Sequence, residues 1–188
     1  MEKRKTIFLI NGSASRNSAN QAILNAFVGL VSDQVEFQLC DDLKTIPHFD
    51  PERSVSFPPP EIIKLRSDLD NADGIVICTP EYVFSIPSGL KNVIEWCVSV
   101  TVLENKPIGI ITASANGLKG HEELQLLIKT LMGSFTAETT LLIQGVKGKV
   151  NSVGAITDEQ TKMELLKFSA NFLDHMNNSK LEPQKEIK

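Results

Sequence analysis

The chain has 188 residues, of which 41% are hydrophobic and 22% charged, and its formal net charge is −4. This composition is typical of a soluble globular protein, and no apolar run approaches the ~18 residues that a membrane-spanning helix needs. The acidic balance, without any cluster of basic residues, argues against a nucleic-acid-binding surface. We therefore expect one domain over residues 1–176 and a polar C-terminal tail over 177–188, with neither a membrane nor a nucleic acid as partner.

Two further features concern the cell compartment and metals. The charged start MEKRK is followed by an apolar segment that is too short for a secretory signal, so we expect a cytoplasmic protein. Cys40, Cys78 and Cys97 show no CxxC spacing and no histidine in a metal-ligand pattern. They are expected to be buried reduced thiols, and no metal site is predicted.

Short β-branched runs alternate with longer segments of helical period along the chain. Strands are predicted at 5–10, 35–39, 74–79, 106–113 and 139–143. Helices are predicted at 18–31, 60–71, 87–98, 118–132 and 158–176. Such βα units in series predict an α/β fold, in which a five-stranded parallel sheet is covered by helices on both faces.

Two strand orders are common for a sheet of this kind, the dinucleotide-binding order and the flavodoxin-like order 2-1-3-4-5. In the second, the order reverses between strands 1 and 3, and a ligand binds at the loops that follow them. Here these loops are 11–20 and 79–88, which are also the most unusual connections in the chain. We therefore predict a flavodoxin-like three-layer sandwich.

The first of these loops, NGSASRNSAN, is rich in serine and asparagine. It lacks both the GK[ST] of a Walker A loop and the glycines of GxGxxG, which disfavours a dinucleotide. A terminal phosphate monoester would instead use hydroxyl and amide donors at a helix N-terminus, together with one cation. The candidates are Ser13, Ser15, Arg16, Ser18 and Asn20. The simpler alternative is a capping box between Ser18 and Gln21.

The segment 45–60 carries five prolines and interrupts the alternation of strands and helices. We interpret it as a long loop before the second helix.

The segment TPEYVFSIPSGLKNVIEW, residues 79–96, has Pro80 and Pro87 at the two ends of a rigid connection. Its backbone groups, together with Tyr82 and Phe84, could hold a flat heteroaromatic ring. Simple packing is the alternative for Tyr82, and it is the favoured interpretation for Trp96, which falls inside the predicted helix.

Together the two motifs resemble the NADPH-dependent FMN reductase family of flavodoxin-like proteins, which includes chromate, quinone and azo-dye reductases. That family shows GSxRxxSxN after strand 1 and PEYNxSxPGxLKNAIDW after strand 3. The chain matches the first motif at Gly12, Ser13, Ser18 and Asn20, and the second at Pro80, Glu81, Tyr82, Ser85, Pro87, Leu90, Lys91, Asn92 and Trp96. The resemblance covers about residues 5–175.

Two departures from the family pattern change the expected site. Ser15 stands where many members have the arginine, and Arg16 follows one place later, so either residue could reach the phosphate. Val83 and Phe84 replace the usual asparagine and small residue, which predicts a narrower and more apolar ring pocket.

A third loop, TASANGLKGHEE at 112–123, resembles the family's third flavin loop. Its small residues Ser114, Asn116, Gly117 and Gly120 would let the backbone pass close to the flavin. A turn with a helix cap is an equally good interpretation.

The resemblance implies an FMN-dependent NAD(P)H oxidoreductase, with bound FMN and with NADPH or NADH as co-substrate. A hydride would pass from the nicotinamide to the flavin N5, and electrons would then pass to a small-molecule acceptor. Because the flavin carries this chemistry, no catalytic acid or nucleophile is required. Tyr82, Val83 and Phe84 would border the ring, while backbone amides near Glu81 and Tyr82 would bind its heteroatoms. Members of the family are commonly dimers, so a homodimer or a dimer of dimers through the helix after Pro87 is expected.

Two other functions remain open from the sequence. A flavodoxin-like electron carrier would hold FMN beside an acidic rim, for which Asp41, Asp42, Asp50 and Glu52 are the nearest candidates. A non-catalytic binding module would bind no flavin. A preference for NADPH would need a cation near its 2′-phosphate, and Arg53, Lys91 and Lys119 are the candidates for that contact.

Overall fold

The computed structural model of the chain describes residues 4–15, 17–40 and 42–179. Within these residues, parallel strands form a five-stranded sheet in the order β2-β1-β3-β4-β5. Its strands are β1 Thr6–Asn11, β2 Glu36–Cys40, β3 Gly74–Thr79, β4 Ile108–Ser114 and β5 Thr140–Gln144. The predicted sheet and its strand order are confirmed.

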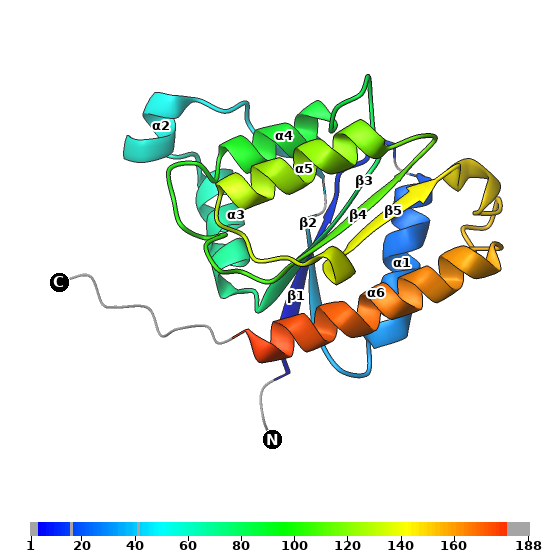
Figure 1. Cartoon of the computed structure of the whole chain (residues 1–188). Coiled ribbons are helices and arrows are strands. Elements are labelled where there is room, and N and C mark those ends of the chain that lie inside the picture. The colour runs from blue at the N-terminus through cyan, green and yellow to red at the C-terminus, as the bar shows by residue number, and fades with distance from the viewer. Residues whose placement is uncertain (1–3, 16, 41, 180–188) are drawn as a thin grey trace.

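Helices cover both faces of the sheet and complete the three-layer sandwich (Figure 1). One face carries α1 Ala19–Val31 and α6 Glu159–Asn178, and the other carries α3 Pro60–Asn71, α4 Ser88–Glu95 and α5 Leu118–Thr130. Each face has its own hydrophobic cluster. Among the described residues, no helix combines the length and the apolar character that crossing a membrane requires.

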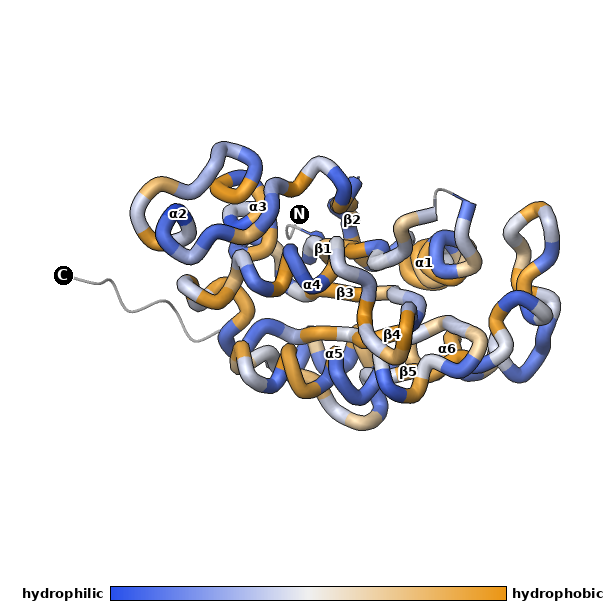
Figure 2. The backbone as a smooth tube through the Cα atoms, turned by 90° about the horizontal axis from the view of Figure 1, so that it is seen from above, coloured by the Kyte–Doolittle hydropathy of each residue, from blue (hydrophilic) through white to orange (hydrophobic). Residues whose placement is uncertain are grey.

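The two central strands lie at the middle of the core. Every residue of β3 and β4 is buried, and Figure 2 shows hydrophobic residues gathered along both strands. Parallel strands covered on both faces have no solvent side, which explains the uninterrupted apolar runs. The sheet is therefore a rigid base for the loops at its carboxyl edge.

The prediction of one continuous loop over 45–60 is wrong. A short helix, α2 Pro51–Ser56, lies inside it, and a 3-10 turn, η1 Leu43–Thr45, overlaps its start. The Asp50 side chain accepts hydrogen bonds from the backbone N–H groups of Glu52 and Arg53, and Pro51 occupies the first helical position. An aspartate cap followed by proline starts a helix, because proline has no N–H to satisfy there.

Two smaller expectations also need correction. Helix α6 continues past the predicted end at 176 to Asn178, so the first part of the predicted tail is helical, and residues 180–188 lie outside the described residues. Cys78 and Cys97 are buried as expected, but Cys40 is only half-buried because it ends β2, the edge strand.

Candidate functional site

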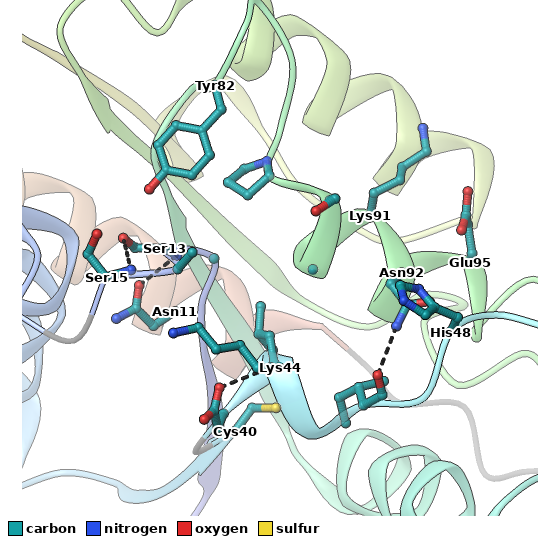
Figure 3. Close-up of a pocket in the computed structure, with 18 of the residues that line it drawn as sticks. Asn11, Ser13, Ser15, Cys40, Lys44, His48, Tyr82, Lys91, Asn92 and Glu95 are labelled. Carbon is teal, nitrogen blue, oxygen red and sulfur yellow. Dashed lines mark hydrogen bonds between the residues drawn. The ribbon is translucent and has the colours of Figure 1, made fainter.

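A cleft of about 720 Å³ opens at the carboxyl edge of β1 and β2, with α4 as its opposite wall (Figure 3). The first loop, Tyr82, the segment after β2 and the first two turns of α4 contribute to it. Its lining residues are Asn11, Gly12, Ser13, Ala14, Ser15, Gln21, Leu39, Cys40, Asp42, Leu43, Lys44, Ile46, His48, Phe49, Tyr82, Pro87, Ser88, Gly89, Lys91, Asn92 and Glu95.

The first loop presents serine hydroxyls to this cleft. Gly12 N–H donates to Cys78 O at 2.8 Å, and a Cβ on Gly12 would lie 2.4 Å from Thr79 Oγ1, so only glycine lets the loop pass this close to β3. Ser13 Oγ accepts from the backbone N–H of Ser15 at 3.2 Å. That bond uses a lone pair and leaves the Ser13 O–H available as a donor. Two of the predicted residues, Ser13 and Ser15, line the cleft.

The remaining predicted residues of the first motif have other positions. Ser18 is the N-cap of α1 and accepts from Gln21 N–H at 3.1 Å, which is one half of the expected capping box, whereas the Gln21 side chain bonds Asn11 and Asn25 instead of Ser18. Asn20 is buried, and its amide nitrogen donates to Ala113 O at 3.1 Å, which fastens α1 to β4 beneath the loop. Arg16 lies outside the described residues.

The second loop contains a tight two-residue turn. Tyr82 and Ser85 exchange backbone hydrogen bonds of 2.9 and 3.0 Å, while Val83 and Phe84 between them have φ values of 52° and 59°. Tyr82 lines the cleft, whereas the side chains at the tip are 94% and 73% exposed. The Tyr82 N–H, one of the backbone amides expected to bind ring heteroatoms, donates to Ser85 O inside the turn.

Glu81 joins the second loop to the third. Its carboxylate accepts from the backbone N–H groups of Gly117 at 3.2 Å and Gly120 at 2.8 Å, at the N-terminus of α5. Ser114 Oγ donates to Glu81 O at 3.4 Å. Pro80, at the end of β3, is buried. Asn116 is exposed and accepts from Gln144 Nε2 at 3.1 Å. Glu81, Ser114, Gly117 and Gly120 therefore form one bonded unit next to Tyr82, and the predicted residues Asn116, Val83 and Phe84 lie outside it.

Two motif residues, Asn92 of α4 and Trp96 at its C-terminal end, act as anchors. Asn92 Nδ2 and Trp96 Nε1 both donate to Pro47 O, at 2.9 and 2.8 Å, and Asn92 Oδ1 accepts from Phe49 N–H at 2.7 Å. Trp96 is fully buried, as the packing interpretation predicted. These bonds hold the segment after β2 against α4 and so form the far wall of the cleft.

A second group of contacts positions the start of α4. Glu123 of α5 accepts from Ser85 Oγ at 2.6 Å and from Ile86 N–H at 3.0 Å, and it pairs with Lys91 at 3.3 Å. Partial burial alone would raise the pKa of Glu123, but the hydrogen bonds and the lysine charge outweigh burial and lower it. The Lys91 ammonium therefore has an ion-pair partner in the Glu123 carboxylate.

Several cleft residues were not predicted from the sequence. They come from β2 and the segment after it, and they are Leu39, Cys40, Leu43, Lys44, Ile46, His48 and Phe49. Asp42, which the sequence suggested only for the acidic rim of an electron carrier, lines the cleft as well. One signal could have found them: the order 2-1-3-4-5 places strand 2 beside strand 1, so the segment after strand 2 must lie next to loop 11–20.

The sequence of the chain is similar to that of a known protein family and to several curated proteins. The sequence model of a family described as "NADPH-dependent FMN reductase" matches residues 6–145. A quinone reductase of Escherichia coli strain K12 is 27% identical over 136 residues, which cover 70% of this chain and 71% of that protein. The NADH:(hydroxy)cinnamate reductase subunit CrdA of Vibrio ruber is 29% identical over 164 residues, which cover 83% and 79%.

Solved structures support the same fold. FerB, a flavoenzyme NAD(P)H:(acceptor) oxidoreductase from Paracoccus denitrificans, superposes with a TM-score of 0.75 at 22% identity and covers 93% of this chain and 98% of its own. Flavodoxin 1 from Bacillus cereus has a TM-score of 0.61 at 14% identity, with coverages of 91% and 98%.

Proposed function

The chain belongs to the NADPH-dependent FMN reductase family, and from that premise we propose that it is an FMN-dependent oxidoreductase that passes electrons from NAD(P)H to a small-molecule acceptor such as a quinone. One observation carries the proposal. The same cleft is bordered by the first loop at 11–20, which we call the serine loop, by the N-terminus of α1 and by Tyr82. The cleft is large enough for a cofactor.

The donors in this cleft fit FMN. Ser13 and Ser15 supply hydroxyls at the start of a 13-residue helix, whose dipole favours a phosphate. Tyr82 offers an aromatic face to the rings, and the unit of Glu81, Ser114 and Gly117 lies beside it. Bound FMN would supply the redox chemistry that links NAD(P)H oxidation to reduction of the acceptor.

The protein's contribution is position and shape. The buried sheet fixes the loop ends, the bonds from Glu81 join the second and third loops, and Asn92 with Trp96 closes the far wall. These contacts pre-organise the cleft, which would hold a bound cofactor and acceptor in a fixed orientation. No side chain has to act as an acid or a nucleophile.

We further propose a homodimer that uses the face around α4. Large exposed apolar side chains occur at Val55 and Phe57 near α2, at Ile63 on α3 and at Val98 after α4. These elements adjoin one another, because the Arg66 guanidinium donates to Ser54 Oγ at 2.7 Å and to Trp96 O at 2.7 and 3.0 Å. Apolar side chains that gather on one surface are typical of a protein interface.

An electron carrier is the less supported alternative. Two residues of its expected acidic rim serve as caps, since Asp42 accepts from Lys44 N–H and Asp50 from Glu52 N–H. The likeness to flavodoxin 1 at 14% identity concerns the fold. The deciding experiment measures oxidation of NADPH and NADH by the FMN-loaded protein with a benzoquinone. The proposal predicts direct consumption, whereas a protein that binds FMN but consumes neither nucleotide without a partner reductase would be a carrier.

A further inference from the structure

Lys44 occupies a defined position at the edge of the cleft. It lies in η1 directly after β2, and the turn is held by hydrogen bonds from Lys44 N–H to Asp42 Oδ1 at 2.9 Å and from Thr45 Oγ1 to Asp42 O at 2.8 Å. Leu43 beside it is buried against the core. The backbone is therefore fixed, and only the long side chain is left to move.

The Lys44 side chain is directed into the cleft. Figure 3 shows it extending from η1 towards the side on which Asn11, Ser13 and Ser15 lie. Its ammonium group is thus brought to the serine loop from the side opposite α1. This approach comes from strand 2, a part of the chain that neither sequence motif includes.

The Lys44 ammonium has no ion-pair partner within the part of the chain that the structure describes, although the Asp42 carboxylate accepts from its backbone N–H. There the Lys44 ammonium makes neither a hydrogen bond nor an ion pair, whereas Lys91, the other lysine of the cleft, is paired with Glu123 at 3.3 Å. A lysine that faces hydroxyl donors and a helix N-terminus contributes to a field that favours an anion.

We propose that Lys44 binds the phosphate monoester of FMN, as a second source of positive potential besides the N-terminus of α1. This inference rests on the proposed function. A phosphate monoester suits the arrangement, because its oxygens can accept from serine O–H groups on one side and from an ammonium on the other. The lysine ammonium is a compact charge at the end of a flexible side chain, so it needs no fixed two-bond geometry with the phosphate oxygens, as an arginine would.

The test compares FMN with riboflavin, which has the same rings and no phosphate. Flavin-free protein is titrated with each flavin by fluorescence, for the wild type, Lys44→Gln and the control Lys129→Gln. Lys129 is exposed in the last turn of α5, at the other end of that helix from Gly117, so the control removes the same charge far from the cleft. Each titration is repeated at low and high salt.

The proposal predicts that Lys44→Gln weakens FMN binding by about 10-fold, leaves riboflavin binding unchanged, and reduces the salt dependence of FMN binding. Lys129→Gln should match the wild type in FMN affinity, in riboflavin affinity and in the salt dependence of FMN binding. If Lys44→Gln lost affinity for FMN and for riboflavin equally, the assignment would be overturned. An equal loss of FMN affinity in Lys44→Gln and Lys129→Gln would also overturn it. So would unchanged FMN binding with a raised KM for NADPH but not for NADH, which would give Lys44 to the 2′-phosphate of the dinucleotide. A wild type that binds neither flavin would instead overturn the proposed function itself.

Discussion

The Glu81 carboxylate accepts a 2.8 Å hydrogen bond from the backbone N–H of Gly120, across 39 positions of sequence. The same carboxylate accepts from Gly117 N–H, so it satisfies two of the N–H groups that the first turn of α5 leaves without helical partners. A negative charge at this place also complements the helix dipole. Glu81 therefore joins the loop after β3 to the loop after β4.

Replacing Glu81 with alanine should destabilise the protein, because two backbone N–H groups lose their acceptor. We expect Glu81→Ala to lower the free energy of unfolding by about 1 to 3 kcal/mol, measured by urea denaturation. The control is Glu122→Ala, which loses only an exposed contact with Lys119 and should cost less than about 1 kcal/mol. Equal losses in the two variants would show that the Glu81 contacts do not stabilise the loops.

The pH dependence of stability should reveal Glu123. Its pKa in the folded protein is lowered from the ordinary value of 4.5, because the bonds from Ser85, Ile86 and Lys91 outweigh burial, which alone would raise it. A lowered carboxyl pKa contributes stability above the unfolded value, and that contribution is lost as the pH falls through the folded value. The difference in the free energy of unfolding between the wild type and Glu123→Gln should therefore shrink below pH 4.5. A difference that stays constant with pH would contradict this.

The turn at Val83 and Phe84 carries backbone strain. Both residues have positive φ, a region that favours asparagine and glycine and is especially unfavourable for a β-branched side chain. Val83→Asn should raise the free energy of unfolding by about 1 kcal/mol. The matched control is Val153→Asn, at an exposed valine outside the left-handed region, which should change little. A gain of the same size in the control would remove strain as the explanation.

The proposed dimer predicts that one surface substitution separates the subunits. Phe57 is 82% exposed in the single chain, so Phe57→Asp places a charge in the interface without disturbing the core. Light scattering after size exclusion should give a dimer for the wild type and a monomer for Phe57→Asp. Leu126→Asp, at an exposed leucine of α5, should remain dimeric. A wild-type monomer would contradict the proposal.

The sheet could be predicted because its signals are local. Runs such as GIVICT are mostly apolar, and each is followed by a segment of helical period, so the strands and their parallel arrangement follow from the sequence. The strand order needed a second signal, the unusual loops after strands 1 and 3. The α2 helix is harder to predict, because the five prolines of 45–60 are typical of a loop, although Asp50 followed by Pro51 is a helix start.

The site was only partly predictable, because its geometry depends on contacts between distant residues. The motif identified Ser13, Ser15 and Tyr82, which do line the cleft. It could not show that Trp96 and Asn92 both donate to Pro47 O, which lies 49 positions before Trp96 and 45 positions before Asn92. Nor could it show that the Tyr82 amide is used within its own turn. Tertiary contacts of this kind leave no periodicity in the sequence.

The proposed function requires that the cleft between the serine loop and Tyr82 holds FMN. The most direct measurement is an absorption titration of the flavin-free protein with FMN, followed by anaerobic addition of NADPH and then NADH. We expect uptake of one FMN per chain, bleaching of the flavin absorbance by at least one of the nucleotides, and weaker uptake in a variant carrying both Ser13→Ala and Ser15→Ala. No uptake by the wild type, or equal uptake by that variant, would contradict it.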